Sequence, residues 1–285
     1  MKKGLNIKAQ VTVFIIIGII VVAVAGGVGY SIKVSQDAKL NTEYFSSADI
    51  KPQMDNLKFS IFNCLEEVSE GGLKVIGFQG GYYNPPSKSF DMGWAFVPYY
   101  YHEGDILMPS KEVIANELAD FVNNNMDVCL KKISIGDFEL SYNTPKTKVS
   151  IKDEEVLFKI DMPIIIKKED KGITLELGGH PVSQASALND ILEIAKYITD
   201  SHELDASMYC ITCVADMAEE RDVYVHNTVM GDGDVYVIIG ENRVSDEPYL
   251  FSFMNKYTGD EISDDIALMG DNYEGLPGSA GVGNE

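Results

Sequence analysis

The chain has 285 residues, with 23 Lys and Arg against 44 Asp and Glu, and its formal net charge is −21. This charge argues against nucleic acid as a partner, because phosphate binding needs a basic face. Hydrophobic residues make up 45 % of the chain, which allows a packed core, and the four cysteines are too few for a disulfide-dense miniprotein.

The N-terminal residues predict a membrane segment. Residues 1–10 contain three lysines and no acid, and residues 11–32 contain no charged side chain. The run Val11–Tyr30 is ~30 Å long as a helix, which is enough to cross a bilayer. The positive-inside rule then places residues 1–10 in the cytoplasm as a basic leader and residues 33–285 outside the cell. A cleaved secretory signal that ends near Ala25-Gly26-Gly27 is the alternative.

A processing motif precedes the apolar run. Its residues, Lys8-Ala9-Gln10-Val11-Thr12, resemble the class III, type IV pilin-like signal of archaea. The resemblance implies cleavage between Ala9 and Gln10, which leaves the apolar helix on the mature protein. Phe14 stands at the fifth mature position, where many pilins carry Glu. This difference weakens the interpretation as a polymerising pilin and leaves the interpretation as a membrane anchor unchanged.

The part of the chain after the apolar run predicts a stalk and a folded ectodomain. Residues 33–49 are polar and mixed, which is typical of a stalk, and residues 50–257 contain the periodic segments. Apolar side chains at three- and four-residue steps predict a first helix over Pro52–Ser69. We expect the pair Gly71-Gly72 to end this helix.

Residues 77–109 are rich in aromatic side chains and are broken by Gly-Gly and Pro-Pro pairs, which predicts a long loop. Exposed aromatic rings are typical of surfaces that bind proteins or glycans. The candidate binding residues are Tyr82, Tyr83, Trp94, Tyr99, Tyr100 and Tyr101. The alternative is that these rings fold back and supply the core of a small sheet.

The remaining elements complete an expected α+β fold, with antiparallel β-meanders interleaved with helices. Ser110 is a suitable N-cap for a second helix that ends near Lys131. A β-meander is expected next, with strands over Phe138–Tyr142, Lys146–Lys152, Val156–Lys167 and Ile173–Leu177. Within it, Pro163 suits an edge position or a bulge. Two further helices are expected over Ser186–Ser201 and Leu204–Glu219, and three strands over Val223–Val229, Val235–Ile239 and Tyr249–Met254. Acidic and Gly-rich residues 258–285 predict a disordered tail.

The four cysteines predict disulfides, because the ectodomain is expected outside the cell. Cys64 and Cys129 each lie late on a predicted amphipathic helix, so we expect them to be joined. Cys210 and Cys213 form a CxxC motif, which we place inside the fourth predicted helix. A local disulfide, pairing with the other two cysteines, a redox site and a four-cysteine zinc site are the alternatives for this motif.

No sequence motif predicts catalysis. The chain contains no HExxH, GxSxG, P-loop or GxGxxG pattern, so we expect no catalytic residue, cofactor or metal. The favoured function is a non-enzymatic, single-pass surface protein that serves adhesion or cell-envelope assembly. A pilin-like filament subunit is the first alternative. A membrane-tethered thiol-disulfide oxidoreductase that uses the CxxC motif is the second.

The features together resemble a group of surface proteins from small-genome archaea. The resemblance includes Cys64 followed by Gly77-Phe78-Gln79-Gly80-Gly81-Tyr82, a second helix ending at Cys129, and the closing segment Tyr249–Tyr257. It implies a cell-surface location and supplies no catalytic residue. The possible partners are the membrane, a second copy of the chain in self-assembly, or a cell-surface protein or glycan.

Overall fold

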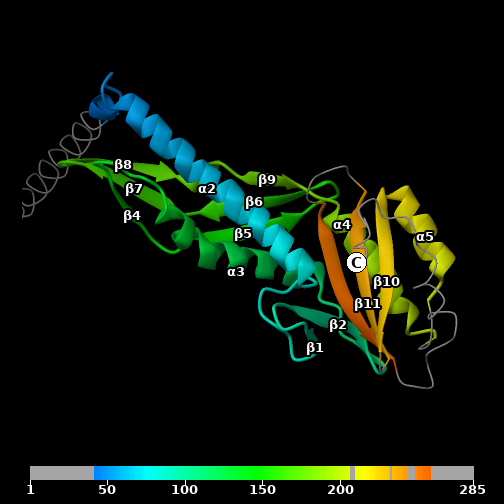
Figure 1. Cartoon of the computed structure of the whole chain (residues 1–285). Coiled ribbons are helices and arrows are strands. Elements are labelled where there is room, and N and C mark those ends of the chain that lie inside the picture. The colour runs from blue at the N-terminus through cyan, green and yellow to red at the C-terminus, as the bar shows by residue number, and fades with distance from the viewer. Residues whose placement is uncertain (1–41, 206–208, 232, 243–247, 258–285) are drawn as a thin grey trace, which may run out of the picture. The chain divides into compact units, whose positions relative to one another are not determined.

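The computed structural model describes residues 42–205, 209–231, 233–242 and 248–257 (Figure 1). The expected leader, the apolar run 11–32, stalk residues 33–41 and the tail 258–285 lie outside the described residues. Within the described part of the chain, no helix combines the length and apolarity needed to span a membrane. The fold there is mixed α+β, as the sequence predicts.

The chain divides into two compact units. Among the described residues, the smaller unit comprises 42–59, 134–141 and 165–175, and the remainder forms the larger unit. The N-terminal turns of helix α2 (Lys51–Phe78) belong to the smaller unit, and the helix continues into the larger one.

The smaller unit is organised around a three-stranded sheet in the order β4-β7-β8. These strands are β4 (Glu139–Tyr142), β7 (Pro163–Lys168) and β8 (Lys171–Glu176), and the ends of β4, β7 and β8 extend beyond the unit. The Lys168 ammonium donates a hydrogen bond to Gln53 (3.1 Å) and lies 5.0 Å from the centre of the Phe138 ring. Phe45, Met54, Leu57 and Ile166 are buried here.

The larger unit contains two sheets. One has the order β5-β6-β9, from β5 (Lys146–Ile151), β6 (Glu155–Asp161) and β9 (Val182–Ala185). The other has the order β1-β2-β12-β11-β10, with β3 (Asp105–Ile106) also paired to β2. Its strands are β1 (Ser89–Asp91), β2 (Phe96–His102), β10 (Val223–Gly231), β11 (Asp234–Glu241) and β12 (Leu250–Lys256).

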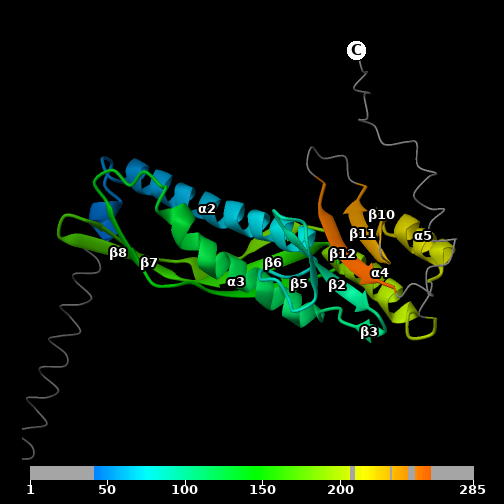
Figure 2. The same ribbon diagram turned by 60° about the horizontal axis from the view of Figure 1, so that its bottom comes forward.

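Three helices follow α2 in the larger unit, together with the short 3-10 helix η1 (Leu177–Gly179). Helix α3 (Lys111–Leu130) packs on β5, α4 (Leu188–Ser201) contacts β11, and α5 (Ile211–Glu220) packs on β10. Figure 1 and Figure 2 both show α5 alongside β10 and β11. The central strand β12 is buried along almost its whole length, so both faces of the sheet are covered at this strand.

Helix α2 corrects the predicted end of the first helix. It does not stop at Gly71-Gly72 but continues to Phe78. A Cβ atom at Gly72 would lie 2.8 Å from the Phe121 ring of α3, so the glycine allows the two helices to approach closely. The helix is terminated by a Schellman motif, in which Gly80 has a φ of +54° and the Gly81 N–H donates to the Ile76 carbonyl (2.8 Å).

Helix α3 confirms the predicted second helix. Ser110 is its N-cap, and the Ser110 hydroxyl accepts a hydrogen bond from the Val113 N–H at 3.3 Å. This bond satisfies one of the free N–H groups of the first turn.

The predicted meander is divided between two sheets. The expected strand Val156–Lys167 is interrupted at Met162, and Pro163 opens β7, where a missing N–H costs least. The hairpin β5–β6 pairs as expected, from Lys146 opposite Asp161 to Ile151 opposite Val156. Strand β9 is an addition that the sequence pattern did not predict.

The aromatic segment 77–109 is not a continuous loop, since it forms β1, β2 and β3. Strand β2 pairs in parallel with β12, with Met254 opposite Tyr99. The larger sheet is therefore not wholly antiparallel, which departs from the expected meander. The other pairs of this sheet are antiparallel in the described residues.

Candidate functional site

Two of the candidate binding residues lie in the core. Tyr100 is fully buried, stacks on Phe253 with 4.4 Å between ring centres, and donates to the Gly80 carbonyl at 3.0 Å. Tyr101 is 1 % exposed and stacks on the His202 ring at 4.3 Å. Burial raises the pKa of the Tyr100 hydroxyl well above its ordinary value. These rings hold the larger sheet together and offer no surface to a partner.

Three other candidates are half-buried and tied to their surroundings. The Tyr83 N–H donates to Glu117 at 2.8 Å. The Tyr99 hydroxyl donates to Asp234 at 2.9 Å. Burial raises the pKa of Tyr82, and the Glu117 carboxylate adds to the effect. Burial also raises the pKa of Tyr99, and its bond to Asp234 adds to that effect, so both hydroxyls stay protonated near neutral pH.

Trp94 is the candidate that faces solvent. It is 76 % exposed and lies in the turn between β1 and β2. The Gly93 N–H donates to the Asp91 carboxylate at 2.7 Å, and the Met92 N–H donates to the Ala95 carbonyl at 2.9 Å. The indole lies 5.1 Å from the Phe78 ring. A hydrogen-bonded turn thus presents one large aromatic side chain to the outside.

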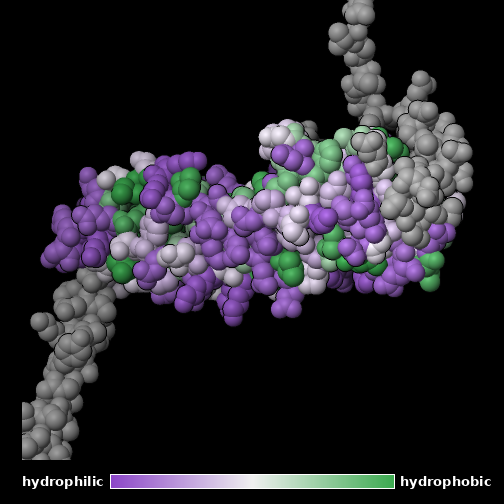
Figure 3. Space-filling model, turned by 90° about the horizontal axis from the view of Figure 1, so that it is seen from below, coloured by the Kyte–Doolittle hydropathy of each residue, from purple (hydrophilic) through white to green (hydrophobic). Residues whose placement is uncertain are grey.

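One face of the described surface is largely hydrophilic. On the face in Figure 3, hydrophilic side chains predominate, and hydrophobic side chains occur in small separate groups. A partner on that face would therefore meet a largely charged and polar surface.

The Cys64–Cys129 disulfide confirms the predicted link between the first two helices. It joins α2 to α3 across a sequence separation of 65, with the two Cα atoms 5.9 Å apart. Cys64 is 2 % exposed, so the bond is part of the core between these helices.

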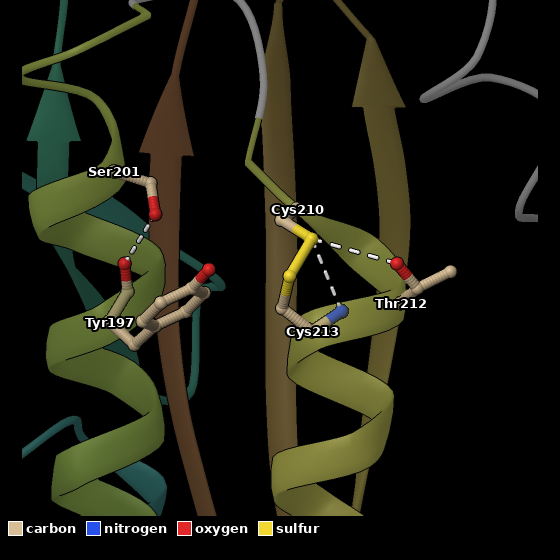
Figure 4. Close-up of a disulfide and its surroundings, with 5 residues drawn as sticks. All are labelled: Tyr197, Ser201, Cys210, Thr212 and Cys213. Atoms are coloured by element: carbon tan, nitrogen blue, oxygen red, sulfur yellow. Dashed lines mark hydrogen bonds between the residues drawn. A yellow bond between two sulfur atoms is a disulfide. The ribbon is translucent and has the colours of Figure 1, made fainter.

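The CxxC motif forms a second disulfide, Cys210–Cys213. It does not lie inside a helix as we expected: Cys210 is the N-cap of α5, and Cys213 is in the first turn. The expected start at Leu204 is wrong, because Leu204 lies in a turn and α5 begins at Ile211. Figure 4 shows the bond at the N-terminal end of α5.

The two disulfides decide between the alternatives for the cysteines. Because the four cysteines pair as Cys64–Cys129 and Cys210–Cys213, cross-pairing and a four-cysteine zinc site do not fit the structure. Across the residues that the structure describes, no group of three or more His, Cys, Asp or Glu side chains is placed to hold a metal ion.

Two buried polar contacts, one at each end of α4, were not predicted from the sequence. His202, at the end of α4, is 5 % exposed, and its Nε2 lies 2.7 Å from the Tyr257 hydroxyl. Its Nδ1 lies 3.1 Å from the Thr199 carbonyl. Glu241 is also buried, and its carboxylate accepts a hydrogen bond from the Ala187 N–H at the start of α4. Both groups attach α4 to the larger sheet, and neither was marked by a local motif.

Comparisons with known protein families, with curated proteins and with solved structures find no match to this chain.

Proposed function

We propose that the chain is a non-enzymatic, single-pass surface protein, whose α+β ectodomain lies outside the cell and serves adhesion or envelope assembly. In this proposal residues 11–32 form the membrane anchor and residues 1–10 stay in the cytoplasm. The pilin-like motif at Lys8-Ala9-Gln10 supports an archaeal surface location.

One observation carries the extracellular part of the proposal. All four cysteines are paired, and disulfides persist in oxidising compartments rather than in the cytosol. The pairing supports the side of the membrane that the lysines of residues 1–10 predict from charge alone.

The contact surface in this proposal is the β1–β2 turn that carries Trp94. An exposed indole on a fixed turn gives a large contact area at a low cost in conformational entropy. The partner is a protein or a glycan of a neighbouring cell or envelope layer.

Membrane topology tests the proposal directly. In cells that express the full chain with a C-terminal tag, added protease should remove the tag, and the protein should sediment with membranes. If mass spectrometry finds a mature protein whose first residue is Gln10, this would support processing after Ala9. A protected tag, or a mature terminus near Gly27 with soluble protein, would contradict the anchored arrangement. Recovery in sheared filaments would favour the pilin-like alternative.

A further inference from the structure

The Cys210–Cys213 disulfide is open to attack from outside the molecule. Cys210 is exposed and Cys213 is half-buried. The disulfide lies at the N-terminal end of α5 (Figure 4). Thiol–disulfide exchange requires a thiolate to reach one of the two sulfur atoms. We propose that this disulfide is a redox site that accepts two electrons from a dithiol of another protein or peptide. The inference goes beyond the adhesive function and does not depend on it.

The N-terminal end of α5 stabilises the Cys210 sulfur in its thiolate form. The Cys210 Sγ accepts a hydrogen bond from the Cys213 N–H at 3.3 Å and lies 3.6 Å from the Thr212 hydroxyl. Helix α5 has no acidic side chain in its first turn, so no carboxylate of that turn offsets the positive end of the helix dipole. A reduced form stabilised in this way makes a CxxC disulfide a better oxidant.

The packing around the motif holds it in place. Tyr209, directly before the motif, is 9 % exposed, and its hydroxyl accepts a hydrogen bond from the Asn227 amide on β10. Val214 is buried one residue after Cys213. The Tyr197 side chain of α4 points toward the disulfide in Figure 4. The disulfide is therefore presented from a fixed position, with Cys210 exposed and Cys213 half-buried.

The proposed exchange has two steps. A substrate thiolate attacks the Cys210 Sγ, the Sγ–Sγ bond breaks, and its electron pair leaves on the Cys213 Sγ, which takes a proton from water. The second substrate thiolate then attacks the substrate sulfur of the mixed disulfide and releases the Cys210 thiolate. The dithiol has become a disulfide, the cysteine pair has gained two electrons, and one proton has gone to solvent. A low-molecular-weight disulfide re-oxidises the pair by the reverse sequence.

Graded reduction of the full chain in detergent tests the accessibility of the bond. The protein is equilibrated with dithiothreitol, quenched with acid and alkylated, and each cysteine is measured by mass spectrometry. We expect Cys210 and Cys213 to become free at a reductant concentration at least about tenfold lower than Cys64 and Cys129. Helical circular dichroism should be retained at that point. Simultaneous opening of both disulfides, or opening of the CxxC pair only in denaturant, would overturn the proposal.

Single-cysteine variants test the chemistry. With a model dithiol peptide and an oxidised low-molecular-weight disulfide, Cys213→Ser should accumulate a mixed disulfide through Cys210, and the matched Cys210→Ser should accumulate much less. In Cys213→Ser, the pH midpoint of alkylation should lie at least one unit below the ~8.5 of an ordinary cysteine. Adding Thr212→Val should raise the midpoint, and adding Thr212→Ser should not. An ordinary midpoint, or equal trapping by the two variants, would contradict the site.

Discussion

The two disulfides of this chain sit in opposite surroundings. Cys64–Cys129 links two long helices, is buried on its Cys64 side and closes a separation of 65 residues. Cys210–Cys213 spans three residues and lies at the exposed start of a ten-residue helix. The same covalent bond thus stabilises the packing of one region and is open to exchange in the other. Sequence separation and burial, rather than the presence of cysteine, decide which role each pair takes.

The largest expected effect on stability comes from removing the Cys64–Cys129 disulfide, which we compare with removal of Cys210–Cys213. On the loop-entropy relation, Cys64→Ala with Cys129→Ala should lower the free energy of unfolding by ~4 kcal/mol, because the closed loop is long. Cys210→Ala with Cys213→Ala should lower it by at most ~2 kcal/mol, because that loop is short. Urea unfolding of the full chain in detergent measures both. Equal losses would remove the stability contrast between the two regions.

A smaller effect is expected from the glycine pair of α2. Gly72→Ala would place a Cβ 2.8 Å from Phe121, whereas a Cβ at Gly71 meets nothing within 4 Å. Overpacking of this kind costs ~1–3 kcal/mol. Gly71→Ala, in the same helix, should instead stabilise by ~0.5–1 kcal/mol.

Thermal unfolding of the two alanine variants provides the measurement. A Gly72→Ala protein as stable as Gly71→Ala would mean that α2 and α3 do not pack as closely as the structure shows, and would weaken the account of the buried disulfide.

The two N-caps provide the finest comparison. Ser110 caps α3 with its hydroxyl, and Cys210 caps α5 with its sulfur. Ser110→Ala should cost ~1 kcal/mol, and Ser110→Asp should retain most of the stability, because a carboxylate also accepts the N–H and favours the helix N-terminus. Chemical denaturation checks the pair. If Ser110→Asp loses as much as Ser110→Ala, the hydroxyl is not acting as a cap.

The sequence predicted the features that depend on one or two residues and their local pattern. Ser110 marked the start of α3, and the positions of Cys64 and Cys129 late on apolar faces predicted their disulfide. Glycine misled the prediction for α2, because Gly72 serves close helix packing instead of ending the helix. The sequence shows that a glycine is present, but not which neighbouring side chain needs the space.

Long-range pairing and burial explain most of what the sequence did not predict. Strand β2 pairs in parallel with β12, which lies far away in the sequence, so no local pattern reveals this contact. The aromatic run left two alternatives open, and the structure divides it between them, since Tyr100 is buried in the core and Trp94 is exposed within a few residues. The start of α5 was misplaced because Tyr209 and Cys210, which continue a helical spacing in the sequence, lie before the helix, which begins at Ile211.

The most direct test of the central claim is the redox state of the cysteines in living cells. Cells expressing the full chain are quenched with acid and alkylated, and the peptides are mapped without reduction. We predict that Cys64 and Cys129 are recovered joined and unalkylated, because the proposed extracellular location is an oxidising compartment. Free, alkylated thiols at both positions in fully folded protein would place these residues in a reducing compartment and contradict the extracellular assignment.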